Sequence, residues 1–326
     1  MSDICKLGQY TLEERLGEGG MGVVYRASHG MLRRPTAIKL LHPEHAGEDG
    51  LARFEREVQR TAMLTHPNTV TVFDYGRTTE GVFYYAMELL DGISIEELVN
   101  AHGPQPEERV IHLLVQAAGS LAEAHDAGLI HRDVKPGNIL VVDRGGIPDH
   151  VKVLDFGLVK DIGTGTETAL TVADAITGTP LYVAPEAITS PETVDGRVDI
   201  YALGAVGYWL LTGTDVFGGR TVLEALAHHV HSTPERPSAR LGAPVAADLE
   251  AVILACLAKR PEDRPQSAHT LRDRLRACEA NGGWTDDRAA QWWADYRAAK
   301  RRGGGSVRAR ASPIAAGRLT VTRLGD

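Results

Sequence analysis

Hydrophobic positions in the first third of the chain stand in short runs interrupted by glycines and by Pro35, a pattern typical of β-strands. We expect such strands within Tyr10–Leu41 and again at Thr69–Tyr75 and Val82–Leu89. Between them, Gly50–Leu64 spaces its charged and apolar residues as the two faces of a helix. This part of the chain is predicted to form a small, sheet-rich lobe with one main helix.

After Gly92 the apolar residues follow a helical period instead. Glu107–Gly128 predicts a long amphipathic helix, with Pro106 at its start and a glycine at its end, as helix termini prefer. Asp199–Thr212 is apolar on nearly every side and predicts a buried helix. Further helices are expected at Thr221–His231, Ala246–Leu257 and Gln266–Cys278, and short strands at Ile139–Val142 and Val151–Leu154. The whole pattern predicts an α+β chain in which a small β-rich lobe precedes a larger, mostly helical lobe.

The composition narrows the function classes. With 326 residues, 43% of them hydrophobic, the chain can bury a large core, and its net charge of −8 gives no general case for nucleic acid. Cys5, Cys256 and Cys278 form no CxxC pair, which favours a reducing cytoplasm over a disulfide framework. The N-terminus lacks the apolar segment of a signal peptide, and the longest apolar run, around Tyr201–Gly213, is too short to cross a membrane. We therefore expect a cytoplasmic protein without a membrane span.

The C-terminal residues differ in character from the rest of the chain. Trp284, Trp292 and Trp293 predict a helical extension over residues 279–302 that docks on the large lobe, and an exposed aromatic binding patch is the alternative. From Arg297 to the end, eight Lys or Arg stand against one Asp. Residues 303–326 carry few apolar side chains, so we expect a basic, disordered tail, either without function or in electrostatic contact with an acidic surface.

The sequence GEGGMG at residues 17–22 has the GxGxxG spacing of loops whose backbone N–H groups approach phosphates. The next residues, VVY, suggest a strand and not a helix. They argue against a dinucleotide-binding turn and for a strand–loop–strand hairpin. The alternative is a glycine turn that serves only the fold.

Lys39 lies in an apolar strand, 17 residues after Gly22. A lone lysine there usually faces solvent, and the functional alternative is a lysine that pairs with phosphates and with a helix carboxylate. Glu57 is the candidate carboxylate, because Phe54 and Val58 mark its side of the predicted helix as buried. Its neighbour Glu55 is expected to be a solvated surface charge.

Three further segments are more specific: HRDVKPGN at residues 131–138, DFG at 155–157 and APE at 184–186. With the glycine loop and the strand lysine, in this order and at these spacings, they resemble the eukaryotic-like protein kinases in their serine/threonine variant. The stretch GEGGMGVVY most resembles the bacterial members. The resemblance covers about Tyr10–Cys278 and implies a bilobal protein kinase fold, with an N-lobe at residues 10–89 and a C-lobe at residues 90–278.

The resemblance implies a catalytic set of Lys39, Glu57, Asp133 and Lys135, with Asn138 and Asp155 as metal ligands. Asp133 is expected to accept the hydrogen bond of a substrate hydroxyl and, late in the transfer, its proton. Lys135 is expected to hold the migrating phosphoryl group through its charge. The ligand oxygens suit Mg²⁺, with Mn²⁺ as an alternative.

The resemblance also implies an ATP site, formed by Leu16, Gly17, Gly19, Gly20, Gly22, Val24, Ala37, Lys39, Met87, Glu88, Leu89 and Leu140. Val24, Ala37 and Leu140 are expected to form the walls of the adenine slot. Met87 matches the gatekeeper of the family, and Glu88 and Leu89 match the hinge whose backbone meets the purine edge. GTP in place of ATP is left open by these residues.

By resemblance, the segment GTPLY at 178–182 receives the substrate residue, with Thr179 beside the catalytic residues. The loop before it is rich in threonine. Arg132 lies in HRDVKPGN at residues 131–138, which we call the catalytic segment, and its guanidinium is a ready bidentate partner for phosphate. We expect autophosphorylation of this loop through a transient dimer, at Thr171 first and Thr177 second. The alternative is that Arg132 only packs the loop and that these threonines are surface residues.

Several residues of the motifs are expected to be structural. By resemblance, Glu186 pairs with Arg264, Asp199 ties down the backbone of the catalytic segment, and His131 packs beneath Phe156. A metal site at His228, His229 and His231 is not favoured, because similar segments in the family are surface helix ends.

The sequence therefore predicts a serine/threonine kinase that acts on Ser or Thr hydroxyls of proteins. A pseudokinase that binds nucleotide without turnover is the rival, and the complete catalytic set argues against it. A small-molecule kinase of the same fold lacks the APE and GTPLY features.

Overall fold

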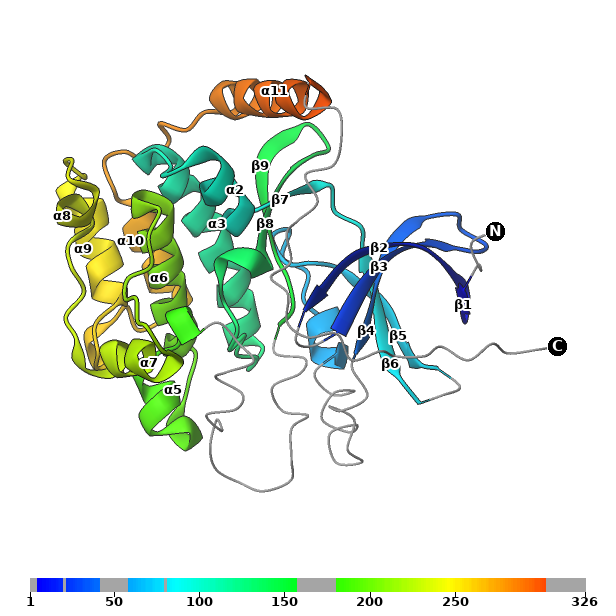
Figure 1. Cartoon of the computed structure of the whole chain (residues 1–326), viewed down its shortest axis with the longest axis horizontal. Helices are drawn as coiled ribbons and strands as arrows, with labels where there is room; N and C mark the ends of the chain where they lie inside the picture. The colour runs from blue at the N-terminus through cyan, green and yellow to red at the C-terminus, as the bar shows by residue number, and fades with distance from the viewer. Residues whose placement is uncertain (1–4, 20–21, 42–57, 79–80, 157–179, 303–326) are drawn as a thin grey trace.

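The computed structural model describes residues 5–19, 22–41, 58–78, 81–156 and 180–302. Figure 1 shows a lobe built on a sheet beside a lobe built mainly of helices. The sheet of the first lobe has the strand order β1-β2-β3-β4-β6-β5, and a smaller sheet in the second lobe has the order β7-β8-β9. The predicted α+β architecture, with the β-rich lobe first, is confirmed.

The strands of the first sheet are β1 (Cys5–Leu7), β2 (Tyr10–Gly19), β3 (Gly22–His29), β4 (Pro35–Leu41), β5 (Val72–Arg77) and β6 (Phe83–Glu88). Neighbouring strands are antiparallel, and Lys39 of β4 lies opposite Val24 of β3 on one side and Tyr85 of β6 on the other. Because side chains alternate between the faces of a sheet, adjacent tyrosines of β6 enter different clusters. Tyr85 packs with Ala37, whereas Tyr84 packs on the opposite face.

The strands of the smaller sheet are β7 (Gly92–Ser94), β8 (Ile139–Arg144) and β9 (Ile147–Val153). The helices are α2 (Ile95–His102), α3 (Glu107–Asp126), α5 (Pro185–Thr189), α6 (Arg197–Thr212), α7 (Val222–His231), α8 (Pro237–Leu241), α9 (Ala247–Cys256), α10 (Ala268–Arg276) and α11 (Asp286–Arg302). Single 3₁₀ turns at Pro136–Asn138, Pro180–Tyr182, Pro191–Thr193 and Pro261–Asp263 join them. None of the described helices is long and apolar enough to cross a membrane.

The centre of the helical lobe is α6, which is buried on nearly all sides as its sequence predicts. It ends at Gly213, whose φ of 70° is the left-handed conformation that glycine adopts without strain. Strand β1 and helix α2 were not predicted. Helix α2 has an evident local signal, because Ser94 and Glu97 form a capping box at its first turn. The predicted helix at Gly50–Leu64 lies largely outside the described residues, of which 58–62 are helical.

Residues 68–70, which precede β5, connect the first lobe to the second through backbone hydrogen bonds. Val70 N donates to Val153 O of β9 at 3.0 Å, and Val153 N donates to Asn68 O at 2.8 Å. Glu88, at the end of β6, forms an ion pair with the buried Lys152 of β9 at 2.7 Å, so a charged bond also joins the lobes. Thr69 and Ser120 share a buried hydroxyl–hydroxyl hydrogen bond of 2.7 Å. These bonds fix the end of β9 relative to the first sheet.

The C-terminal helix α11 packs across the β8–β9 hairpin (Figure 1). Its docking point is a buried ion pair, in which Arg109 of α3 binds both oxygens of Asp149 at 2.8 and 2.9 Å. The indoles of Trp284 and Trp293 donate to the same carboxylate at 2.8 and 2.7 Å. Trp292 stacks on the Arg109 guanidinium, 3.9 Å from the ring centre. The carboxylate therefore has four donors, and two come from the C-terminal extension.

We predict that a chain ending at residue 278 is less stable than one ending at residue 302. Removing the extension uncovers Arg109 and Asp149 and deletes the buried Trp293. Loss of one buried tryptophan costs about 3–5 kcal/mol. For a domain of this size, that lowers the unfolding temperature by on the order of 10 °C. Thermal unfolding followed by circular dichroism checks this.

The matched control is Gln291→Ala in the longer chain. Gln291 lies on the exposed face of α11, and its side chain donates to Asp295 of the same helix. We expect Gln291→Ala to leave the unfolding temperature unchanged. Equal unfolding temperatures for the chains of 278 and 302 residues would show that the extension contributes nothing to the fold.

Candidate active site

The two lobes meet at Asp155, which follows β9. Its carboxylate lies between two side chains of the first sheet: Lys39 Nζ is 2.7 Å from Oδ2, and the Tyr85 hydroxyl donates to Oδ1 at 2.5 Å. Burial by itself would raise the pKa of Asp155, but the charge and hydrogen bond of Lys39 and the hydrogen bond of Tyr85 outweigh it, and the pKa is lowered. The group is therefore a carboxylate at neutral pH.

The backbone around Asp155 is held in an unusual conformation. Its φ is 55°, which few residues other than glycine adopt, and such positions concentrate at functional sites. The next side chain, Phe156, is fully buried, and its ring lies 4.6 Å from that of His131. His131 Nε2 is 2.8 Å from the carbonyl oxygen of Leu154. His131 therefore packs beneath Phe156, as the resemblance implies.

The catalytic segment presents three polar side chains from the turn before β8. Lys135 Nζ lies 2.8 Å from Asp133 Oδ2, and Asn138 Nδ2 donates to Oδ2 and to the main-chain oxygen of Asp133, both at 2.9 Å. The 3₁₀ turn at Pro136–Asn138 brings the amide back onto Asp133. The two donors on one oxygen fix the rotation of the Asp133 carboxylate.

Asp199 holds the backbone of this segment from beneath, as expected. It lies in the first turn of α6, and its carboxylate accepts the backbone N–H groups of His131 and Arg132, both at 2.8 Å. His125 Nε2 lies 2.8 Å from the same carboxylate. Burial would raise the pKa of Asp199, but its hydrogen bonds and the nearby histidines keep the pKa low. Arg132 has a φ of 62°, so Asp199 stabilises a strained loop.

The residues present fit a divalent cation. Asp155 offers carboxylate oxygens, and because the Asn138 Nδ2 atom is engaged by Asp133, the amide oxygen remains as a ligand. Both are the hard oxygen donors that Mg²⁺ and Mn²⁺ prefer. Among the described residues, no group of three His, Cys, Asp or Glu could hold a metal ion. A cation here would therefore need further oxygens, such as those of phosphates.

The described glycines of the β2–β3 hairpin differ in how far the fold itself requires them. Gly22 is required by the fold, because a Cβ there would lie 2.0 Å from the carbonyl oxygen of Leu40. At Gly17 and Gly19, by contrast, a Cβ would meet no described atom within 4 Å. The hairpin itself does not need glycine at those two positions. We infer that their missing side chains serve the approach of a ligand.

Several residues of the expected adenine slot belong to one apolar cluster of the first lobe. Ala37 and Met87 belong to one buried cluster, with Val24 and Leu89 packed against it. Leu154 also packs there, although the sequence did not mark it as part of the slot. Leu140 of β8 is half-buried and Leu16 is largely exposed. Neither residue belongs to this cluster as formed by the described residues. The Glu88 side chain turns away toward Lys152, which leaves its backbone as the part able to meet a purine.

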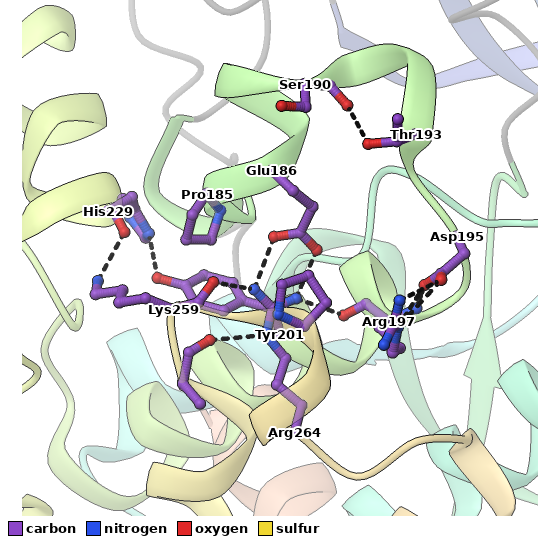
Figure 2. A network of polar contacts seen from close by, with 12 residues as sticks. Pro185, Glu186, Ser190, Thr193, Asp195, Arg197, Tyr201, His229, Lys259 and Arg264 are labelled. Atoms are coloured by element: carbon purple, nitrogen blue, oxygen red, sulfur yellow. Dashed lines mark hydrogen bonds and ion pairs between the residues drawn. The ribbon is translucent and has the colours of Figure 1, made fainter.

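A second polar network surrounds Glu186 of α5, which follows the GTPLY segment (Figure 2). Arg264 binds both oxygens of Glu186 at 2.6 and 2.7 Å, as the resemblance implies. The same guanidinium donates to the main-chain oxygens of Arg197, Ala258 and Lys259. The pair therefore joins α5 to the start of α6 and to the turn before α10.

His229 corrects one expectation. The sequence predicts a surface helix end at residues 228–231, but His229 is fully buried, and its Nδ1 lies 2.8 Å from the Tyr201 hydroxyl oxygen. Burial and the nearby Lys259 lower the pKa of His229 to about 4, so the ring is neutral at physiological pH. Lys259 donates to the main-chain oxygen of His229 at 2.7 Å (Figure 2).

Several predicted site residues lie outside the described residues: Gly20, Glu57, Thr171, Thr177 and Thr179. The described residues unite Lys39 with Asp155, and Asp133 with Lys135 and Asn138. Sequence reasoning missed Tyr85, which contacts Asp155. Its only signal is a polar aromatic residue inside an apolar strand, and the register that places it opposite Lys39 is not visible in the sequence.

The fold and this site define a protein kinase, and comparison with known proteins agrees. The protein kinase domain family matches residues 10–275. The chain is 38% identical to the serine/threonine-protein kinase pkn3 of Myxococcus xanthus over 274 residues, which are 83% of this chain and 50% of that protein. It is 39% identical to PknB of Mycobacterium tuberculosis over 268 residues, 81% of this chain and 42% of PknB.

Solved structures show the same likeness. The PknI kinase domain of Mycobacterium tuberculosis superposes with a TM-score of 0.65 at 28% identity, covering 85% of this chain and 98% of that chain. Rad53 in complex with AMP-PNP superposes with a TM-score of 0.67 at 25% identity, covering 82% and 64%. This chain belongs to the bacterial, eukaryotic-like serine/threonine protein kinase family, whose members use ATP and a divalent metal ion. It spans half or less of the length of these two curated relatives.

We predict that Arg264→Ala destabilises the protein by about 3–5 kcal/mol, because it leaves Glu186 without its bidentate partner. Thermal unfolding measures the loss. The control is Arg260→Ala, since Arg260 is 70% exposed whereas Arg264 is 0% exposed. Surface ion pairs contribute little, so the control should unfold like the wild type. If the two variants unfold alike, the buried pair does not support the fold as described.

Proposed function

We propose that this chain is an active serine/threonine protein kinase that transfers the γ-phosphate of ATP, with Mg²⁺, to Ser and Thr hydroxyls of proteins. The proposal is supported by the polar cluster of Asp133, Lys135 and Asn138. A second support is the ion pair between Asp155 and Lys39. A pseudokinase would be expected to lack part of this set. We propose residues 10–278 as the catalytic domain, with residues 279–302 as an extension and 303–326 as a separate basic tail.

The proposed chemistry assigns one task to each side chain. Asp133, whose rotation is fixed by its two donors, orients the substrate hydroxyl and takes its proton late in the transfer. Lys135 lies beside it and stabilises the negative charge of the transferred phosphoryl group. Lys39 holds the α- and β-phosphates. The set positions the reactants in line and stabilises the developing charge, which is most of what phosphoryl transfer requires.

Asn138 and Asp155 would hold Mg²⁺ through their oxygens, and we propose Mn²⁺ as a substitute because it accepts the same ligands. The bound cation supplies charge neutralisation for the triphosphate. Gly17, Gly19, Gly20 and Gly22 would cover the phosphates through their backbone. The adenine would occupy the slot of Val24, Ala37 and Met87, bounded by Leu16 and Leu140, with the backbone of Glu88 and Leu89 at its edge.

We propose the cytoplasm as the compartment, because ATP is the donor and Cys256 and Cys278 are free thiols. The proposed partners are proteins with Ser or Thr acceptors, received near Thr179. A transient dimer would allow one copy to phosphorylate another.

We predict that Lys39→Met folds but loses nearly all autophosphorylation, and that Asp133→Ala does the same. Each variant removes a charge that the transfer step needs while keeping the core. Incorporation of the γ-phosphate of ATP measures the activity, and circular dichroism measures the fold. Lys300→Met removes a lysine from the exposed end of α11 and is expected to keep full activity. Activity of Lys39→Met within tenfold of the wild type would rule out its assigned role.

We also propose that phosphorylation of the loop before Glu186 activates the enzyme. The backbone of Arg132 has a φ of 62° and donates its N–H to Asp199. The position of the Arg132 backbone next to Asp133 therefore does not depend on a phosphate. A phosphothreonine adds about −1.5 to −2 charges and can bind a guanidinium through two oxygens. Thr171 is the first candidate and Thr177 the second.

We predict that mass spectrometry of protein produced with ATP finds phosphate on Thr171 or Thr177, and that the Asp133→Ala protein carries none. The double variant Thr171→Ala with Thr177→Ala should lose most activity toward a protein substrate. Thr193→Ala changes an exposed threonine away from the loop and serves as the control. An unmodified loop in active enzyme, or full activity of the double variant, would contradict the proposal.

A further inference from the structure

Tyr85 is a buried phenol whose hydroxyl bonds a residue of the active site. It is 1% exposed and lies in the middle of β6. The described residues give its hydroxyl one hydrogen bond, to Asp155 Oδ1 at 2.5 Å. A hydroxyl that donates to an ionised carboxylate forms a charge-assisted hydrogen bond, which is stronger than a neutral one. A phenol buried in an apolar sheet normally needs a partner, and this one reaches across the lobe boundary to find it.

We propose that Tyr85 is a positioning residue for Asp155, which sets the orientation in which this carboxylate binds the divalent cation. The inference rests on the proposed function, in which Asp155 is a metal ligand. Tyr85 itself touches neither nucleotide nor metal in this assignment. It acts through the carboxylate, as the hydrogen-bond partners of metal ligands commonly do.

The geometry carries the proposal because the two donors divide the carboxylate between them. Lys39 binds Oδ2 and Tyr85 binds Oδ1, so neither oxygen can rotate away without breaking a bond. A carboxylate has about four acceptor positions, and each oxygen therefore keeps one for a cation. Lys39 alone would hold only one oxygen and would leave rotation about the side chain less restricted.

The sheet gives Tyr85 this position. Lys39 and Tyr85 are opposite each other in the β4–β6 register and lie on the same face. Asp155, with a φ of 55°, comes from the other lobe. The bond therefore joins the rigid sheet directly to a strained functional residue.

The test measures Mg²⁺ binding through its effect on nucleotide affinity, without turnover. The affinity of the full chain for AMP-PNP is measured by calorimetry in EDTA and over a series of Mg²⁺ concentrations. The variants are Tyr85→Phe, which removes only the hydroxyl, and Tyr84→Phe, which removes the hydroxyl of the adjacent residue on the opposite face. Asp155→Asn is the variant that tests the metal ligand itself.

We expect Tyr85→Phe to bind AMP-PNP in EDTA as the wild type does. The Mg²⁺ concentration for half-maximal gain in affinity should rise by about 10–100-fold, the usual effect of losing a partner of a metal ligand. Tyr84→Phe should match the wild type in both measurements. A merely structural role for Tyr85 would instead change the affinity in EDTA and in Mg²⁺ by the same factor.

The outcomes separate this inference from the proposed function. If Asp155→Asn removes the Mg²⁺ dependence but Tyr85→Phe keeps the wild-type midpoint, Tyr85 does not position Asp155 and only this inference fails. If Asp155→Asn retains the wild-type dependence, Asp155 is not the ligand and both fail.

If Tyr85→Phe unfolds too readily for calorimetry, the same question is answered by thermal unfolding. The wild type, Tyr85→Phe, Asp155→Asn and the double variant form a cycle, and a bond that orients Asp155 requires the two changes to be coupled. Additive effects would overturn the proposal.

Discussion

The junction of the two lobes centres on one carboxylate, Asp155, which is partly buried. Asp155 belongs to the helical lobe by sequence, but its two described donors, Lys39 and Tyr85, come from the sheet of the other lobe. A partly buried carboxylate loses hydration and needs hydrogen-bond donors, and both described donors are supplied only when the two lobes are in place. The backbone bonds between Val153 and the segment at 68–70 keep them there. The site is therefore a property of the interface between lobes and not of either lobe alone.

The same principle recurs elsewhere in the helical lobe. Asp199 holds the strained backbone of the catalytic segment, and Asp149, with a φ of 50°, is surrounded by Arg109 and two indoles. Each acidic side chain is buried, fully paired, and placed where segments distant in the sequence meet. Such groups contribute little net stability as pairs, but losing one partner is expensive. They therefore specify one arrangement of the segments that they join.

The C-terminal extension lies beyond the residues that match the kinase family, but it supplies hydrogen bonds to the kinase domain. The kinase family matches residues up to 275, yet Trp284 and Trp293 supply two of the four donors to Asp149. Asp149 lies in β9, the strand that leads to Asp155 and bonds the first lobe. The extension therefore supports the strand that leads to the metal-ligand candidate, Asp155.

The sequence by itself determined the lobe order, most helices and the motif residues, because amphipathic period, glycine spacing and short polar motifs are local properties. Helix α6 and the segment at 131–138 are read directly from such patterns. Tertiary structure alone decided that Tyr85 faces Lys39 and Asp155, that His229 is buried, and that Asp149 binds two indoles. These facts depend on strand register and on packing between segments at least 28 residues apart, for which a single sequence carries no periodic signal.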